Sequence, residues 1–175
     1  MKNMQSMQEF RQALSLLSAA VNVVSTDGPF GRLGLTASAV CSVTDSPPTV
    51  LVCINRNSSI HEAVLGNGAL CVNILPGHQE GVARQFAGMT DVPPAERFAS
   101  EDWRNGSAGL PVLEDALASL EGTIVDVKEV GSHSVLFVEI KHIHLREGGD
   151  SLTYFGRNFH RLGRAVPISQ VPCAS

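Results

Sequence analysis

The sequence predicts a mainly β protein, an antiparallel barrel with flanking helices, and three observations support this fold class. Seven segments of the 175-residue chain are strand-length runs rich in β-branched residues, separated by turn residues. Strands and helices do not alternate regularly, as a doubly wound parallel sheet would require. The length is that of a single domain, since domains commonly span about 100 to 200 residues. We therefore expect one domain over residues 1–162 and a tail at 163–175 that frays.

Three segments are predicted to be helical. Residues 8–20 (QEFRQALSLLSAA) place Phe10, Ala13, Leu14 and Leu17 on one face at helical spacing, so an amphipathic helix opens the domain. Residues 58–68 contain a serine with Glu62 three positions later, the pattern of a capping box at a helix start. Residues 78–90 (HQEGVARQFAGMT) form the third helical segment.

The predicted strands follow from runs of Val, Ile, Thr and aromatic residues bounded by Gly, Pro and Asp. A Pro-Pro turn at 47–48 joins two of them, and the polar segment 93–111 interrupts the series as a long surface excursion. Phe98 and Trp103 are its expected anchors, and the excursion is a pinned loop, a lid or a subunit contact. The seven strands are VNVVST (21–26), LGLTASAVCSVT (33–44), TVLVCIN (49–55), ALCVNIL (69–75), SLEGTIVDVKEV (119–130), SVLFVEIKHIHLR (134–146) and LTYF (152–155).

Charge and composition exclude several partners. The net charge is −4 and there are no runs of Lys or Arg, so we expect neither nucleic acid nor an anionic membrane surface as a partner. No apolar run approaches the roughly 20 residues of a membrane-spanning helix. The start, MKNMQSMQEF, has no apolar stretch of the kind found in export signals, so a cytoplasmic protein is expected.

Cysteine and histidine spacing predicts no metal site. The sequence has no C-x-x-C pair, and Cys41, Cys53 and Cys71 lie among apolar residues as buried thiols do, with the fourth at position 173. His142 and His144 share one face of a strand, but no third ligand is near in sequence. We interpret the two histidines as exposed strand residues.

Small hydroxyl side chains dominate the strand at 33–44, where a core strand would carry Val, Ile or Phe. Thr36, Ser38 and Ser42 have even spacing, which puts them on one face. Asn55, Ser58 and Ser59 follow across the turn at a predicted helix N-terminus, a position that favours anions. These residues together fit a trough for a phosphorylated ligand. On periodicity alone, ordinary strand-edge and N-cap hydroxyls are the favoured alternative.

Several segments in order resemble the short-chain flavin reductase family: residues 19–59, LCVNIL, RQFAGMT, GSHSVLFVEI and LTYFGRNFH. The resemblance covers residues 9–162. It implies a split β-barrel flavin-binding fold, usually a homodimer, that oxidises NADH or NADPH. It also implies FMN or FAD as the flavin and a separate flavin-dependent oxygenase, of a two-component aromatic monooxygenase, as the receiver of reduced flavin.

The resemblance also implies roles for individual residues. The strand at 34–44 matches the family segment that holds the flavin ring and ribityl chain, which implicates Thr36, Ala37, Ser38, Ser42 and Val43. The turn NRNSS matches the phosphate contact, which implicates Asn55, Ser58 and Ser59, with Arg56 as a countercharge. Phe86 corresponds to a position near the flavin, although an aromatic residue on a helix is equally a core residue.

His133, in GSHSVLF, matches the family's Gly-x-His, where the nicotinamide approaches the flavin. Without the resemblance it would be interpreted as an exposed strand-start histidine. Because the cofactors carry hydride chemistry, we expect His133 to position the nicotinamide. Tyr154, Arg157 and His160 resemble the final motif near the same pocket, and Arg157 is a candidate contact for a pyridine-nucleotide phosphate. The alternative function is a flavin-carrying module without reductase turnover, which needs no nicotinamide pocket.

Overall fold

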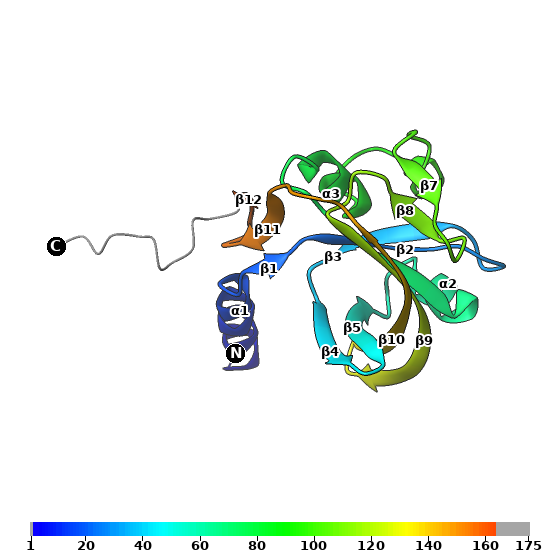
Figure 1. Ribbon diagram of the computed structural model, residues 1–175. Helices are drawn as coiled ribbons and strands as arrows, with labels where there is room; N and C mark the ends of the chain where they lie inside the picture. The colour runs from blue at the N-terminus through cyan, green and yellow to red at the C-terminus, as the bar shows by residue number, and fades with distance from the viewer. Residues whose placement is uncertain (1, 164–175) are drawn as a thin grey trace.

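The computed structural model describes residues 2–163, with side chains from residue 6 onward, so the predicted tail lies almost wholly outside the described residues (Figure 1). Its helices are α1 (Lys2–Ser15), α2 (His61–Asn67), α3 (Glu80–Phe86) and the 3-10 helix η1 (Pro94–Glu96). Its strands are β1 (Ala19–Ala20), β2 (Asn22–Thr26), β3 (Leu33–Ala37), β4 (Val40–Asp45), β5 (Pro48–Asn55), β6 (Ala69–Ile74), β7 (Trp103–Asn105), β8 (Pro111–Leu113), β9 (Ala118–Val130), β10 (His133–Leu145), β11 (Ser151–Phe155) and β12 (Asn158–Leu162).

The main sheet is antiparallel and has seven strands in the order β3-β2-β6-β9-β10-β5-β4. Figure 1 shows it coiled into a barrel. The two edge strands, β3 and β4, are consecutive in the chain and are joined by Ser38 and Ala39 alone. The N–H of Val40 donates to the Ser38 carbonyl (3.0 Å) and the N–H of Cys53 to the Ala39 carbonyl (3.0 Å). We call this crossing between the two edges, residues 38–39, the seam, and it is where the barrel is split.

The prediction of one strand over residues 33–44 is wrong in this respect. The segment forms two strands at opposite edges of the sheet, since β3 pairs with β2 and β4 pairs with β5. Even spacing therefore does not place Thr36, Ser38 and Ser42 on a common face. The physical reason is that the small side chains of Ser38 and Ala39 let the chain change direction between β3 and β4. If these two strands paired with each other instead, the barrel would be closed.

A second, three-stranded sheet (β1-β11-β12) and the hairpin β7–β8 complete the β structure. The excursion at 93–111 contains η1 and β7, and its predicted anchors are confirmed. The rings of Phe98 and Trp103 have centroids 4.9 Å apart, and both pack on Phe86 at 5.0 and 5.2 Å. Aromatic pairs at this spacing stabilise a loop that contains little regular structure.

The apolar core has two main parts, and β2 separates them. One part fills the barrel and includes Val24, Val52 and Leu136, each fully buried. The other lies between the barrel and α3 and includes Val23 and Phe86. All five residues of β2 are buried, as expected for a strand that is covered on both faces.

Two long strands, β9 and β10, carry the barrel curvature. Their pairing shifts register at Phe137/Val138 and again at Ile140/His142, which marks β-bulges. Gly122 lies in the bulged region, where an added Cβ would come within 2.6 Å of the Glu139 carbonyl oxygen. A side chain there would force the two strands apart, so this glycine allows the close approach.

Three local predictions need correction. The first helix is present, but its predicted apolar face is uncovered: Phe10 is 64% and Leu14 51% exposed. The capping box does not form, because α2 begins at His61 and has no side-chain cap. Cys41 is exposed on edge strand β4, whereas Cys71 is buried as expected; position 173 is outside the described residues.

No helix within residues 2–163 is long and apolar enough to cross a membrane.

Candidate functional site

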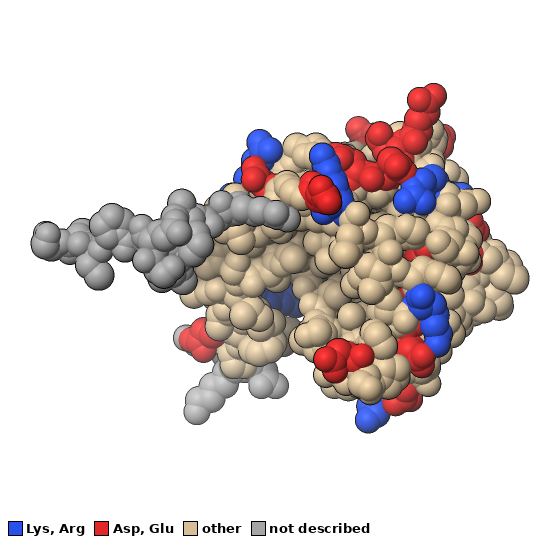
Figure 2. Space-filling model, in the orientation of Figure 1, with Lys and Arg blue, Asp and Glu red and all other residues tan. Residues whose placement is uncertain are grey.

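Hollows that share their lining residues surround the seam. The first is lined by Val21, Thr36, Ser38, Ala87, Met89, Tyr154 and Phe159. The second shares Ser38 and Tyr154 with it and adds α1 residues and Arg157. The third, which also contains Ser38, extends along Val40, Cys41, Leu51 and Cys53. We call the three together the seam cavity. Figure 2 shows a hollow on this face of the molecule, with a basic side chain inside.

Two hydroxyls line the seam cavity, and they differ in their hydrogen bonding. Thr36 Oγ1 donates to the Ala83 carbonyl at 2.7 Å, which ties β3 to α3 and leaves that oxygen available only as an acceptor. The exposed Ser38 hydroxyl has no hydrogen-bond partner among the described side chains and backbone. Ser38 is therefore the hydroxyl that remains free to donate to a bound molecule.

The other predicted residues of this segment lie elsewhere. Ala37 is 7% exposed and belongs to the barrel core. Ser42 and Val43 lie on the exposed part of β4, where the pairing with β5 shifts register between Ser42 and Thr44. Neither residue lines the seam cavity, although Val40 and Cys41 at the start of the same strand do.

The predicted phosphate contacts lie in one turn between β5 and α2. Asn55 Oδ1 accepts from the Asn57 N–H (2.9 Å), and the Ser58 N–H donates to the Asn55 carbonyl (3.0 Å). The Ser58 hydroxyl is buried and has no partner among the described residues, whereas Ser59 is exposed. An orphaned hydroxyl in a polar turn is a feature that an acceptor group would satisfy. We call residues 55–59 the serine turn.

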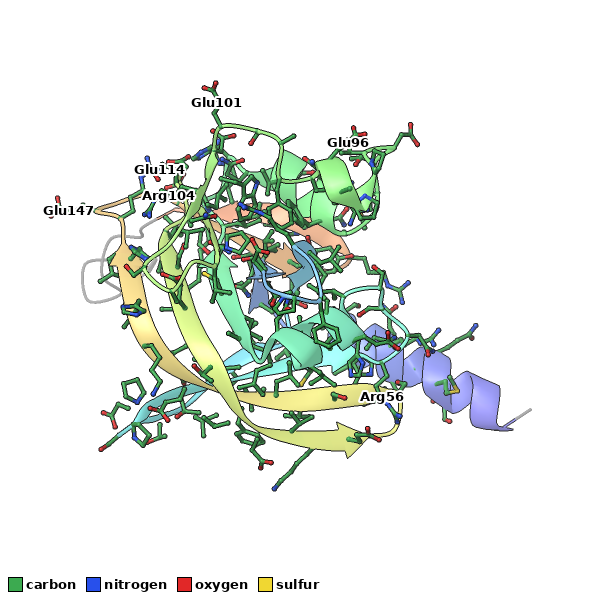
Figure 3. All side chains as sticks on the ribbon, turned by 90° about the vertical axis from the view of Figure 1, so that its right-hand side faces the viewer. Arg56, Glu96, Glu101, Arg104, Glu114 and Glu147 are labelled. Atoms are coloured by element: carbon green, nitrogen blue, oxygen red, sulfur yellow. The ribbon has the colours of Figure 1, made fainter. Side chains whose placement is uncertain are left out.

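Arg56, in the serine turn, already has partners outside this turn. Its N–H donates to the Ser132 carbonyl (2.9 Å) and its guanidinium lies 3.0 Å from Glu129 Oε2. A hollow beside it is lined by Arg56, Asn57, His61, Glu62, Leu65, Gly131 and Ser132. Figure 3 shows Arg56 at the end of the barrel, remote from the acidic side chains around Glu101 and Glu114.

His133 is the first residue of β10 and lies directly opposite Asn55 of β5. It is exposed, and its Nδ1 is 2.9 Å from the Ser132 hydroxyl. Strand pairing therefore places His133 beside the serine turn. It does not line the seam cavity.

Of the last predicted residues, Tyr154 and Arg157 line the seam cavity. Tyr154 is half-buried on β11 and packs edge-on against Phe159 (5.2 Å). Arg157 follows in the β11–β12 turn, and His160 is exposed, with Nε2 3.0 Å from the Phe155 carbonyl. Phe86, in contrast, is 3% exposed and its ring packs on Phe98, Trp103 and the backbone of Gly34. The structure thus has Phe86 in the core, and the adjacent Ala87 lines the cavity.

Two features of the structure were not predicted from the sequence. Arg11 lines the cavity together with Arg157, a position that no local pattern of the helix indicated. Glu121 is fully buried and His144 Nε2 lies 2.8 Å from its Oε1, so His144 is not a free strand histidine. No group of three or more His, Cys, Asp or Glu side chains suited to a metal occurs in the described part of the chain.

Comparison with known proteins identifies the family. The flavin reductase like domain matches residues 14–163. The chain is 60% identical to the 4-hydroxyphenylacetate 3-monooxygenase reductase component of Pseudomonas aeruginosa, over 89% of this chain and 91% of that protein. It is 48% identical to the FMN reductase (NADH) RutF of Stutzerimonas stutzeri, over 89% and 88%.

A solved structure supports the same grouping. The Streptomyces globisporus NADH:FAD oxidoreductase SgcE6, in complex with NAD and FAD fragments, superposes with a TM-score of 0.82 at 26% identity, over 94% of this chain and 96% of that one. Sequence and architecture thus agree across almost the whole domain, and the chain belongs to the flavin reductase like family.

Proposed function

We propose that this protein is an NAD(P)H-dependent flavin reductase that reduces FMN or FAD and supplies the reduced flavin to a separate oxygenase of a two-component monooxygenase. The relatives support this reaction: one is the reductase component of a monooxygenase, and another is an FMN reductase (NADH). When bound, the nicotinamide supplies a hydride and the flavin accepts it, so the protein contributes binding, distance and orientation.

The observation that carries the proposal is a pair of unsatisfied hydroxyls, one at the seam and one in the serine turn. Ser38 is free at the centre of the seam cavity, and the Ser58 hydroxyl is orphaned in the serine turn. Ala39 follows Ser38 and lines the same cavity, and such a small side chain lets a planar ring approach the backbone. We assign Thr36 and Ser38 to the flavin ring side, and Ser58 and Ser59 to its phosphate, because helix α2 begins just beyond them.

His133 is proposed as the residue that positions the nicotinamide. Its exposed ring lies beside the serine turn through the pairing with Asn55, so it is accessible to a second ligand. The Ser132 hydroxyl, 2.9 Å from Nδ1, fixes the ring orientation. A residue in this role changes the KM for NAD(P)H without changing the affinity for flavin.

We infer that the working form is a homodimer. Phe10 and Leu14 of α1 are 64% and 51% exposed, and Leu17, just beyond the end of this helix, is 68% exposed. Exposed apolar side chains gathered in one segment are typical of a surface that another chain covers. The same helix lines the seam cavity. A second subunit on this face would therefore shield the ligand as well as the helix.

One assay tests the activity. Purified protein, NADH or NADPH, and catalytic FMN or FAD are mixed in air, and the loss of nicotinamide absorbance is followed. Catalysed loss that depends on added flavin supports the reductase. No catalysed loss with any of the four combinations, together with measurable flavin binding, would instead support the flavin-carrying module.

A further inference from the structure

Two free thiols, Cys41 and Cys53, line the same hollow of the seam cavity, which has a volume of about 420 Å³. Cys41 of β4 lies directly opposite Leu51 of β5, and Cys53 follows Leu51 at the next position on that face. Side chains alternate between the two faces of a strand, so Leu51 and both thiols share one face, while Val52 points into the barrel core. The two cysteines are far apart in the sequence, so C-x-x-C spacing does not reveal the pair.

The spacing of the two thiols favours a shared metal ion over a disulfide. They are diagonal neighbours, because Cys41 pairs with Leu51 and the N–H of Cys53 donates to the Ala39 carbonyl (3.0 Å). The Cα atoms of such a diagonal pair are about 7–8 Å apart, whereas a disulfide needs about 4.4–6.8 Å. Two metal–sulfur bonds of about 2.3 Å each span up to about 4.6 Å between the sulfur atoms. This span is more than twice the S–S bond of about 2.05 Å, so it suits the diagonal spacing.

Both thiols are available to a ligand. Cys41 is exposed, and its thiol donates to the neighbouring Ser42 carbonyl at 3.2 Å. Cys53 is half-buried, and burial raises the pKa of its thiol. The Cys53 thiol is therefore protonated at neutral pH, and a metal ion that binds its sulfur displaces the proton.

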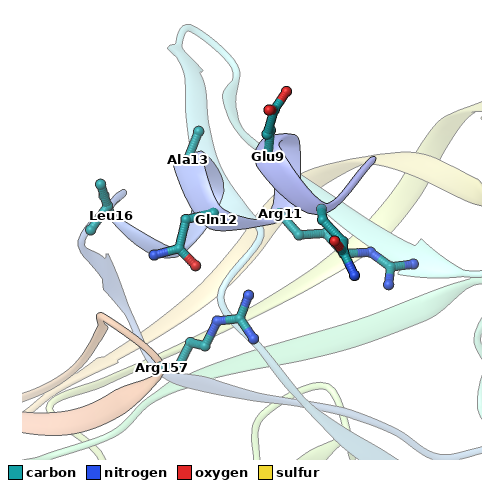
Figure 4. Close-up of a pocket in the computed structure, with 7 residues that line it drawn as sticks. Glu9, Arg11, Gln12, Ala13, Leu16 and Arg157 are labelled. Carbon is teal, nitrogen blue, oxygen red and sulfur yellow. The ribbon is translucent and has the colours of Figure 1, made fainter. Parts of the chain in front are cut away.

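The neighbouring hollow beside α1 offers no comparable ligands. Figure 4 shows this hollow between α1 and Arg157, and its lining contains arginine, glutamine and glutamate side chains but no thiol. Arginine repels a cation, and carboxylate or amide oxygens suit hard ions rather than soft ones. Of these two hollows, a soft cation therefore prefers the one that contains the cysteines.

We propose that Cys41 and Cys53 form a two-coordinate site for a soft monovalent cation such as Cu(I), the type of ion that thiolate ligands select. Each thiol releases its proton to solvent when it binds the ion, and no electron is transferred. Ser38 lines this hollow as well as the first one, so the ion lies beside the surface assigned above to the flavin ring. Bound Cu(I) therefore excludes flavin from the seam cavity, and this second part rests on the proposed function.

The experiment is carried out without oxygen in the Cys173→Ser protein, because position 173 lies outside the described residues and carries another thiol. Cu(I) is supplied from a chromophoric chelator, whose absorbance gives the stoichiometry and the Kd. Cys41→Ser and Cys53→Ser each remove one ligand in this parent protein. Cys71→Ser is the matched control, because Cys71 is buried in a different cluster, against Leu110 and Val112.

We expect one Cu(I) per chain in the parent protein. Either Cys41→Ser or Cys53→Ser should weaken binding by at least about 100-fold, because a lost ligand costs more than a lost outer-shell partner. Cys71→Ser should change the Kd by less than about twofold. Equal affinity in the Cys41→Ser protein and its parent would overturn the site. A disulfide between Cys41 and Cys53, detected by peptide mass spectrometry after exposure to air, would overturn it as well.

Flavin titration tests the exclusion of flavin. With free Cu(I) at about ten times its Kd, competition should raise the apparent Kd for FMN about tenfold in the parent protein, but not in the Cys41→Ser protein. An unchanged value in the parent protein would overturn the exclusion. If the metal-free protein binds no flavin, the proposed function and the exclusion both fail, whereas the Cu(I) stoichiometry still tests the metal site.

Discussion

Glu121 is a buried carboxylate, and we expect its removal to lower the free energy of unfolding. It is 0% exposed, and it accepts hydrogen bonds from the N–H of Ser107 (2.8 Å) and of Ala108 (2.9 Å), with His144 Nε2 2.8 Å away. A Cβ on Gly106 would lie 2.4 Å from Glu121 Oε1, so the loop wraps closely around the carboxylate. The carboxylate thus fixes residues 106–108 to β9.

Glu121→Gln keeps the shape and removes the charge. The amide nitrogen must face at least one of the three donors, so one charge-assisted hydrogen bond is lost and a buried N–H is orphaned. Charged hydrogen bonds contribute about 1.5–3 kcal/mol, and an orphaned buried donor costs a further 1–3 kcal/mol or so. We expect the free energy of unfolding to fall by about 3–5 kcal/mol.

The stability difference between wild type and Glu121→Gln depends on pH, and the pKa of Glu121 determines the direction of this dependence. Burial raises the pKa of Glu121, but the hydrogen bonds from His144, Ala108 and Ser107 together lower it by more than burial raises it. The pKa of Glu121 therefore lies below its usual value. The ionised group therefore stabilises the fold above the unfolded pKa of about 4.3, and this contribution disappears as pH falls through the lower folded pKa. The difference between wild type and Glu121→Gln should narrow below about pH 4.

Urea unfolding of flavin-free protein at fixed protein concentration measures both effects. Glu114→Gln is the matched control, because Glu114 is an exposed partner of Arg104 and its loss should change stability by less than about 1 kcal/mol. A Glu121→Gln protein as stable as wild type at neutral pH, or a difference that is the same at all pH values, would refute the account.

Three further predictions concern the site and assembly. Ser38→Val should weaken flavin binding about tenfold, whereas Ser42→Val should not; equal effects would mean that the flavin spans both strands. His133→Ala should raise the KM for NAD(P)H or slow flavin reduction about tenfold, about 1.4 kcal/mol, with flavin affinity unchanged; poor flavin binding with normal reduction would move His133 to the flavin site. Phe10→Glu should convert a dimer, seen by light scattering, into a monomer, and an active wild-type monomer would exclude a contribution from a second subunit.

Much of the fold is predictable because β-branched runs encode strands locally. All seven predicted segments contain strands, and the anchors Phe98 and Trp103 were identified from their apolar character in a polar loop. What the sequence could not supply was pairing between distant segments. The pairing of β3 with β2 and of β4 with β5 determines which face Ser42 occupies, and no local pattern records it.

Exposure was harder to predict than secondary structure. The periodicity of α1 correctly indicated a helix, but it assumed that the apolar face packs on the same chain, whereas Phe10 and Leu14 are exposed. Cys41 similarly lies among apolar residues in sequence but on an edge strand in space. Arg11 was missed for the same reason, because the position of a helix relative to a remote hairpin depends on tertiary contacts such as the Gly156–Ser15 hydrogen bond.

The seam explains why hydroxyl and alanine side chains occur where a core strand would carry larger ones. A closed barrel would pair β3 with β4, yet within residues 2–163 these strands pair only with β2 and β5. The facing edges therefore leave backbone groups available to a ligand, and large side chains at 38 and 39 would cover them. Under the proposed function, a flavin held through such an open edge contacts the protein mainly along one side. That geometry suits a cofactor that must leave after each reduction, because few contacts have to break before it dissociates.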